Sequence, residues 1–368
     1  MAKLGEVCEV LDSKRVPITA ANRVSGQYPY YGANGVQDYV ADYIFDDELV
    51  LLAEDGGNFG SKEKPIAYRV SGKCWVNNHA HVLKPKAVID VDYLCYSLMF
   101  YDVSGLVNGA TRQKLTQSDM RKMEIPLRTM VEQKNIVCRL NKLTELISLR
   151  KQQLAKLDEL VKARFVEMFG DPVTNPKGYE KYKLENLARK ISDGVHSKPD
   201  YTETGRPFLS VVNINKGVIN FKNCKYVSED AYQKMIKSTH PERGDVLYTK
   251  VGATYGIPAY VDTDIAFCLY VSVCLIKPKR EVINPRFLSL SMEMPYVKHQ
   301  ADRRIKGIGV PDLHLNQISE FEILCPPLKE QDIFIYFVER LDGEKRVVQQ
   351  SLEKLELMKK ALMQEYFG

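Results

Sequence analysis

Residues 133–170 read QKNIVCRLNKLTELISLRKQQLAKLDELVKARFVEMFG, and residues 331–368 read QDIFIYFVERLDGEKRVVQQSLEKLELMKKALMQEYFG. The two segments align without a gap at an offset of 198 positions and share 11 of 38 residues, from Gln133 and Gln331 at the start to Phe-Gly at the end. A match of this length within one chain indicates an internal repeat. We therefore expect one structural unit, a variable globular part followed by a similar helix, to be used twice.

Each of the two segments is expected to form one long helix. Both lack proline, carry apolar residues at spacings of three and four, and end in Phe-Gly, where glycine favours a helix stop. Two rows of residues repeat every seven positions in each segment, which is typical of a coiled coil. In the first segment the rows are Leu140, Ile147, Leu154, Val161, Met168 and Ile136, Leu143, Arg150, Leu157, Arg164. In the second they are Phe334, Leu341, Val348, Leu355, Leu362 and Val338, Lys345, Leu352, Lys359, Tyr366.

In an antiparallel pairing of two helices, the numbers of facing residues have a constant sum. With a sum of 502, the two rows of the first segment face the two rows of the second. This pairing places Leu140 opposite Leu362 and Arg150 opposite Leu352, and it brings no two charged residues together. Each long basic side chain can lay its stem on an aliphatic partner while its charge reaches water. The sequence therefore predicts an antiparallel coiled coil.

The rest of the chain is expected to form two globular domains of mixed structure. Short runs typical of strands, such as residues 48–52, 245–249 and 268–276, alternate with glycine- and asparagine-containing turns. With 368 residues, of which 45% are hydrophobic, the chain is long enough for more than one core. The predicted class is α+β with a pseudo-two-fold internal repeat. The predicted order is a first domain over 1–132, a helix over 133–170, a second domain over 171–330 and a helix over 331–368.

Composition argues against several classes of protein. The eight cysteines form no Cys-x-x-Cys pair, so reduced thiols in a cytoplasmic protein are expected. The sequence shows neither a signal peptide nor an apolar stretch of membrane-spanning length. It also lacks a phosphate loop, a dinucleotide fingerprint and the Asn/Asp-Pro-Pro-aromatic tetrapeptide of adenine methyltransferases. We therefore expect no cofactor and no catalytic residues.

One segment, residues 76–82, contains two histidines that a strand would place on the same face. These are His79 and His81, and Cys74 lies nearby in the sequence. No second cluster of ligands accompanies them, as a structural zinc site would require. No metal site is predicted.

The formal net charge of +5 is unevenly distributed. Residues 1–132 carry 15 basic and 17 acidic side chains, so this segment has a net charge of −2. Residues 171–330 reach only +4. If the chain binds DNA, its affinity cannot rest on phosphate neutralisation alone, so contacts to base edges or a basic partner must contribute.

Polar loops that contain glycine recur in both globular parts. They cover residues 31–35, 54–62 and 108–114 in the first part and residues 250–256 and 303–309 in the second. A single loop of this kind is more often an ordinary turn, but asparagine can pair with adenine edges, and arginine or lysine with guanine. The candidate DNA-contacting residues are Asn34, Asn58, Lys62, Asn77, His79, Arg112, Lys114, Asn213, Lys250, Thr254, Arg303, Arg304 and Lys306.

The chain as a whole resembles the specificity subunits of type I restriction-modification systems. The resemblance lies in the alternation of two variable domains with two similar helices and in four motifs. These motifs are residues 51–60 with the Asp-Gly-Gly-Asn-Phe-Gly loop, Asn-Asn-His-Ala-His-Val-Leu at 77–83, Ile-Pro-Leu at 125–127 and Cys-Pro-Pro-Leu at 325–328. It spans nearly the whole chain, and the arrangement is its most specific part.

The resemblance implies a role in DNA recognition without chemistry of its own. In this family each target-recognition domain reads one half of a split double-stranded DNA site, and the paired helices space the halves and hold two methyltransferase subunits. Adenine methylation, and cleavage when a motor-nuclease subunit joins, would then be activities of partners. The alternative is a coiled-coil scaffold that binds proteins and not DNA.

Overall fold

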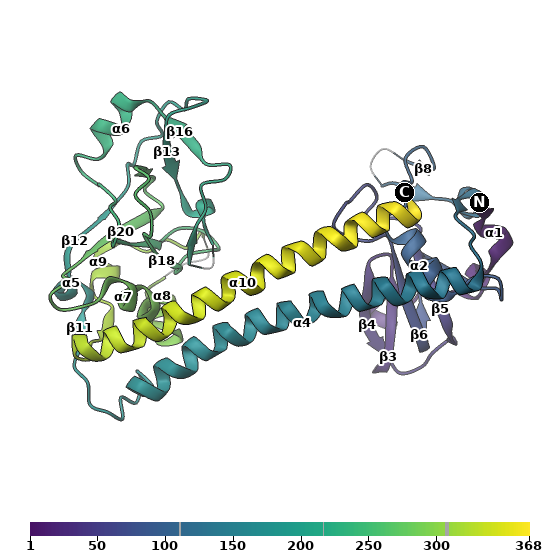
Figure 1. Ribbon diagram of the computed structural model, residues 1–368, viewed down its shortest axis with the longest axis horizontal. Coiled ribbons are helices and arrows are strands. Elements are labelled where there is room, and N and C mark those ends of the chain that lie inside the picture. Colours follow the sequence, from purple (N-terminus) through teal and green to yellow (C-terminus); the bar gives the residue numbers. More distant parts are fainter. Residues whose placement is uncertain (110–111, 216, 306–308) are drawn as a thin grey trace. The chain divides into compact units, whose positions relative to one another are not determined.

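The structure is a computed structural model that describes residues 1–109, 112–215, 217–305 and 309–368 (Figure 1). Helices and short strands alternate along the chain, which confirms the predicted α+β class. The chain divides into two compact units. The first unit comprises Met1–Gln152 and Gln349–Gly368, and the second comprises Gln153–Val348. Each long helix therefore contributes residues to both units.

The first unit is built on a six-stranded sheet around β5 (Phe45–Ala53). Leu49 to Ala53 are fully buried, and neighbouring residues of a strand point to opposite faces. Leu49 and Leu51 accordingly join one apolar cluster, whereas Val50 and Leu52 join a second cluster together with residues of α2 (Val91–Met99). In pairing order the strands are β2 (Cys8–Val10), β7 (Ala80–Pro85), β5, β6 (Ala67–Val76), β3 (Ser25–Gly32) and β4 (Gly35–Val40).

Smaller elements complete the first unit. Its short strand pairs are β1 (Ala2–Lys3) with β10 (Glu124–Ile125) and β8 (Val107–Asn108) with β9 (Lys114–Leu115). Its short helices are α1 (Leu4–Val7) and α3 (Gln117–Lys122). The N-cap side chains of two helices bind free backbone N–H groups: Asp90 accepts at the start of α2, and Thr116 accepts at the start of α3.

The second unit repeats the central part of this arrangement in a four-stranded sheet. Strand β17 (Val246–Thr249) has all four residues buried and pairs antiparallel with β20 (Val273–Pro278), as β5 pairs with β7. In pairing order the strands are β12 (Ala188–Asp193), β20, β17 and β18 (Pro258–Tyr260). A three-stranded sheet consists of β16 (Lys225–Val227), β13 (Arg206–Leu209) and β19 (Cys268–Leu269).

The remaining elements of the second unit are short. The strand pairs are β11 (Lys181–Lys183) with β21 (Glu322–Leu324) and β14 (Ile214–Asn215) with β15 (Val218–Ile219). The helices are α5 (Leu184–Leu187), α6 (Glu229–Met235), α7 (Pro285–Met292), α8 (Pro295–Arg304) and α9 (Leu315–Ser319). Helix α7 takes the place of α2, since Asn284 caps it as Asp90 caps α2.

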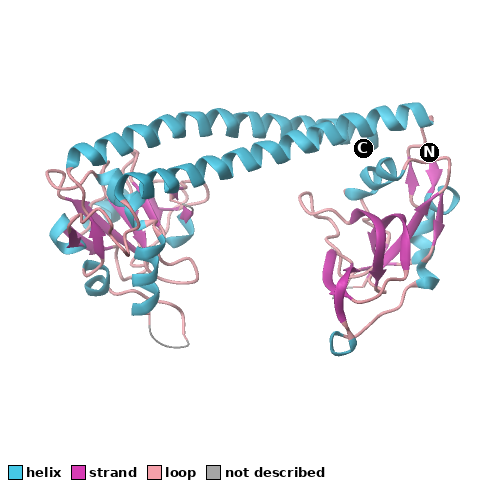
Figure 2. Cartoon of the chain, turned by 90° about the horizontal axis from the view of Figure 1, so that it is seen from below, coloured by secondary structure: helices cyan, strands magenta, loops and turns pink. Residues whose placement is uncertain are grey.

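Except for their final glycines, the two repeated segments lie within continuous helices, α4 (Met130–Phe169) and α10 (Leu328–Phe367), which both views show (Figures 1 and 2). All 20 residues of the four predicted rows are buried or half-buried, which confirms that the rows are packing surfaces. Gly170 follows α4 with a φ of +79°, a conformation that glycine adopts without strain, and so ends the helix where the sequence predicts.

Contacts between α4 and α10 confirm the antiparallel pairing within each unit. In the first unit, Arg150 Nε donates to Ser351 Oγ over 3.3 Å. In the second, Lys345 Nζ lies 2.7 Å from Asp158 Oδ1. The position numbers of these pairs sum to 501 and 503, on either side of the predicted 502.

All eight cysteines, each within the described residues, are free thiols. Burial raises the pKa of Cys8, Cys74 and Cys95 to about 12, so these side chains are protonated and pack as small apolar groups. Among the described helices, none combines the length and the apolar character needed to cross a membrane.

Candidate nucleic-acid interface

Three segments of the first unit meet where β5 ends and β7 begins. Glu54, directly after β5, donates its backbone N–H to His79 O (2.9 Å), and its own carbonyl accepts from Leu115 N (2.7 Å). One step further, Gly56 N donates to Gln113 O (3.4 Å). These backbone bonds hold the loops after β5, before β7 and around β9 side by side.

A fourth segment joins this loop cluster from the turn between β3 and β4. The exposed Asn34 donates from Nδ2 to Gly56 O over 3.0 Å. Asn77 lies beneath the loops and is only 3% exposed. Its Nδ2 donates to Gln37 Oε1 (3.0 Å), and its Oδ1 accepts from His79 N (2.8 Å). The Asn77 amide therefore connects the β3–β4 hairpin to the segment before β7.

Charged side chains surround this meeting point. Asp55 Oδ1 lies 2.6 Å from His79 Nδ1 and 2.7 Å from an Nη of Arg112. Glu54 Oε1 lies 3.0 Å from Lys114 Nζ. Exposed fractions are 60% for the Arg112 side chain, 52% for Lys114 and 33% for His79. Each of these three side chains thus reaches solvent while an acidic residue of the loop after β5 holds it.

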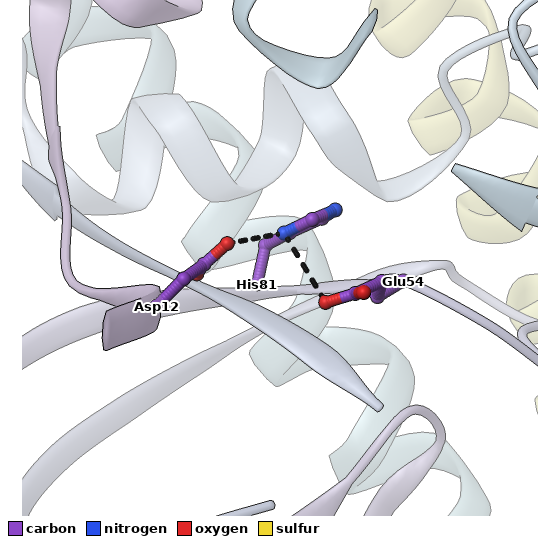
Figure 3. Close-up of side chains that lie close together, drawn as sticks. All are labelled: Asp12, Glu54 and His81. Atoms are coloured by element: carbon purple, nitrogen blue, oxygen red, sulfur yellow. Dashed lines mark hydrogen bonds and ion pairs between the residues drawn. The ribbon is translucent and has the colours of Figure 1, made fainter. Parts of the chain in front are cut away.

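Behind the loops lies a buried cluster of Asp12, Glu54 and His81 (Figure 3). His81 Nδ1 lies 2.7 Å from Asp12 Oδ2 and 3.6 Å from Glu54 Oε2, and its Nε2 lies 3.0 Å from Leu115 O. His81 is fully buried, and both of its ring nitrogens face oxygen atoms. The cluster ties the end of β5, the start of β7 and the segment leading into α3 to one point.

Arg15 supplies positive charge to the same cluster, with an Nη 2.5 Å from Glu54 Oε2. The pKa of Asp12 lies below its ordinary value of 3.8: burial alone would raise it, but hydrogen bonds from His81 and from Val82 N outweigh burial. Asp12, Glu54 and His81 are close enough together to bind one metal ion. A cation there would compete with Arg15 for the same oxygens, so we interpret the cluster as an internal ion network.

The second unit contains an equivalent loop cluster, defined by the same backbone bonds. Lys250 N donates to Ser272 O (3.0 Å), and Lys250 O accepts from Leu313 N (2.9 Å). Gly252 N donates to Pro311 O (2.9 Å), as Gly56 N donates to Gln113 O. Lys250 therefore occupies the position of Glu54, and Ser272 that of His79.

The side chains at equivalent positions differ in kind. Lys250 is 5% exposed, and its Nζ lies 3.5 Å from Asp193 Oδ2 and 3.8 Å from Asp312 Oδ1. Asp312 occupies the position of Lys114, because Val251 bridges to it as Asp55 bridges to Lys114. Both units thus contain an ion pair at this place, Glu54 with Lys114 in the first and Lys250 with Asp312 in the second. The acidic and basic partners have exchanged positions between the two units.

The remaining candidates occupy varied positions. In the first unit, Lys62 is exposed and Asn58 half-buried. In the second, Thr254 and Arg303 are exposed. Their contact with DNA stays a prediction.

Two further candidates of the second unit are held by the protein itself. Asn213 is 6% exposed and accepts a hydrogen bond from Ser210 N over 3.1 Å. Arg304 is half-buried and donates to Gln300 O over 2.9 Å. Lys306 lies outside the described residues.

Asp12, Arg15 and Asp55 were not among the candidate residues predicted from the sequence. Asp55 and Arg112 are 57 positions apart, and Asp12 and His81 are 69 positions apart. Only the order of the strands in the sheet brings them together, so composition and spacing carried no signal for them.

The chain matches known proteins over most of its length. The sequence model of the family described as "Type I restriction modification DNA specificity domain" matches residues 1–159 and 176–357. The Haemophilus influenzae protein described as type I restriction enzyme specificity subunit S.HindORF215P is 26% identical over 391 residues, covering 98% of this chain and 94% of that protein. The Methanocaldococcus jannaschii type I restriction enzyme MjaVIII specificity subunit is 22% identical, covering 99% and 90%.

A solved structure shows the same fold. The crystal structure of the type I restriction-modification system S subunit from M. genitalium superposes with a TM-score of 0.60 at 14% identity, covering 100% of this chain and 95% of that one. The two matched stretches include the first globular part, all but the first five residues of the second, and the larger part of each repeated segment. The chain belongs to the type I restriction-modification DNA specificity family.

Proposed function

We propose that this chain is the specificity subunit of a type I restriction-modification complex and reads a split double-stranded DNA site. Each half-site is read by one target-recognition domain, which we assign to residues 1–132 and 171–330. The segments 133–170 and 331–368 are the helices that join these domains. In this proposal the two domains contact the DNA, and the two helices connect them.

The repeated loop cluster is the observation that best supports this proposal. Both units hold the loop after their central strand with the same three backbone bonds, yet they present different side chains from it. Hydrogen bonds and apolar contacts to base edges specify sequence, whereas phosphate contacts mainly position a protein. Two similar frameworks with different side chains are suited to reading two different half-sites.

The outer faces of α4 and α10 support the docking of partners. Several of their apolar side chains are between 47% and 68% exposed, and exposed apolar side chains on a helix are available to pack against a partner. They include Leu149, Leu160, Val347, Leu357 and Met358. We propose that two methyltransferase subunits bind these faces. A motor-nuclease subunit can then bind to the resulting complex.

The chemistry belongs to these partners in our proposal. The chain itself needs no cofactor and works in the cytoplasm as a non-catalytic subunit. The net charge of −2 on residues 1–132 fits this arrangement, because basic partner subunits can supply part of the contact to phosphate.

A band-shift experiment with and without a type I methyltransferase subunit tests the proposal. We expect a sequence-selective complex with DNA, and mapping of methylated adenines in the source genome should give a motif with two specified halves. A protein-binding scaffold would form no selective complex with DNA under either condition, and this result would reject the proposal.

A further inference from the structure

One carboxylate oxygen organises the solvent-facing side of the first loop cluster. Asp55 Oδ1 binds both His79 Nδ1 (2.6 Å) and an Nη of Arg112 (2.7 Å). The Asp55 backbone is itself fixed, since Asp55 and Lys114 form a β-bridge. The Asp55 side chain is 16% exposed, whereas that of Arg112 is 60% exposed. The acid is therefore set back in the cluster, and the guanidinium projects from it.

The glycine that follows Asp55 allows this arrangement. Gly56 has a φ of +60°, and a Cβ built on it would lie 3.5 Å from Nε and from an Nη of Arg112. The guanidinium therefore lies close over the backbone of the loop. Its orientation is defined by the Asp55 carboxylate on one side and the loop backbone on another.

Stability alone gives a weak reason for this arrangement. An ion pair with an exposed arginine contributes little to folding. A carboxylate near a DNA-binding surface also repels phosphate and so lowers non-specific affinity. Neither folding stability nor DNA affinity therefore explains why Asp55 contacts Arg112. A role in orienting the Arg112 guanidinium does.

We propose that Asp55 is a positioning residue that orients the Arg112 guanidinium for reading a guanine in the first half-site. This inference rests on the proposed function. A guanidinium has five N–H donors, and a single Nη of Arg112 contacts Asp55 Oδ1 (2.7 Å) and His79 Nδ1 (3.3 Å). An adjacent pair of donors stays free to reach O6 and N7 of guanine, the pairing that specifies this base in the major groove. Asp55 itself does not touch the DNA in this scheme.

Among its described residues, the second unit has no equivalent of the contact between Asp55, His79 and Arg112. The shared backbone bonds place Val251 at the position of Asp55, Ser272 at that of His79 and Val310 at that of Arg112. Val310 is 74% exposed. A change at Asp55 should therefore affect one half-site only, which makes the second half-site an internal control.

The test uses the full chain in complex with methyltransferase subunits and a library of randomised DNA duplexes, with bound duplexes sequenced. In Asp55→Ala we expect preference for one base pair of the first half-site to fall about 5- to 150-fold, the range for loss of one bidentate contact. Total binding to non-specific duplex should stay equal or rise, because a negative charge has been removed. A fold defect would instead lower all binding.

Arg112→Ala should relax the same base pair, and the double variant should lose no more than Arg112→Ala alone, because Asp55 acts through Arg112. Asp47→Ala is the matched control: Asp47 pairs with Lys84 at the other end of β5 and should leave both half-sites unchanged. Asp55→Asn keeps the shape of the side chain and should show an intermediate loss.

Several outcomes overturn the inference. Full selectivity in Asp55→Ala and Asp55→Asn would do so, as would losses that simply add in the double variant or relaxation of the second half-site. If the unmodified complex selects no sequence at all, the proposed function fails as well. Selective binding by the unmodified complex with unaffected Asp55 variants would overturn only the role of Asp55.

Discussion

Gln133 and Gln331 make equivalent hydrogen bonds from the first turns of the two long helices. The Oε1 atom of Gln133 accepts from Asp90 N, and that of Gln331 accepts from Asn284 N, both over 2.8 Å. Each Nε2 also donates to two carbonyl groups of its own unit: Val88 and Arg128 in the first case, Val282 and Pro326 in the second. Both glutamines are fully buried. One amide thus fastens each long helix to the capped start of α2 or α7.

Replacing either glutamine by leucine should destabilise its unit. Gln133→Leu removes three hydrogen bonds, those to Asp90 N, Val88 O and Arg128 O, which should cost about 2 to 4 kcal/mol, and Gln331→Leu should cost about as much. Urea unfolding measures the loss. Gln152→Leu is the control, because Gln152 and Gln350 are also identical in the repeat but are exposed. Equal stability of all three variants would contradict this account.

The reversed ion pairs should differ in their contribution to stability. Lys250→Met leaves Asp193 and Asp312 without their buried counter-ion, so a loss of about 2 to 4 kcal/mol is expected. Lys114→Met removes an exposed partner of Glu54, so the change should stay below about 1 kcal/mol. Thermal unfolding of the two variants compares them directly, and a larger loss for Lys114→Met would refute the expectation.

Asp12 should contribute to stability in a pH-dependent way. Its folded-state pKa lies below 3.8, so the carboxylate stabilises the fold above that pH, and the contribution is lost as pH falls through the folded-state pKa. Asp12→Asn should therefore be less stable than the unmodified protein at pH 7, by about 1 to 3 kcal/mol. The difference should shrink as the pH falls below 3.8 and through the folded-state pKa of Asp12. Urea unfolding across this range provides the measurement, and a constant difference would argue against the assigned role.

A fragment of residues 1–170 should associate with itself. In the full chain, Leu362 and Tyr366 of α10 pack with the cluster that contains Ile136 and Leu140 of α4, and the fragment lacks both. An antiparallel self-pairing with position numbers summing to 304 would place Met168 opposite Ile136 and Arg164 opposite Leu140, again without joining two charges. Sedimentation should show dimers at tens of micromolar, and only monomers there would exclude this pairing.

The helices were predictable because their signal is local. A seven-residue repeat predicts which side of a helix packs against a partner. All 20 positions of the rows are buried or half-buried, as expected. Gly170 likewise marks the end of α4 by its own backbone preference. No knowledge of distant segments is needed for either inference.

The candidate site was less predictable because residue type does not determine burial. Asn77 and Lys250 suit base or phosphate contact by their chemistry, yet one is 3% and the other 5% exposed, and each serves as a partner inside its own unit. Asp55, Arg112 and His79 come together only because β5 ends where β7 and β9 begin. The strand order that causes this was not part of the prediction.

The backbone bonds of the loop clusters have a consequence for how recognition can evolve. The three bonds that hold each loop use N–H and C=O groups, which almost every amino acid provides. If the proposed function holds, substitutions at Asp55, His79 or Arg112 would therefore change which bases are preferred without removing the bonds that hold the loop in place. Because the second unit has its own set of bonds, the proposed function implies that the preference for one half-site can change while the other stays fixed, so that a few substitutions in one domain would give a new target.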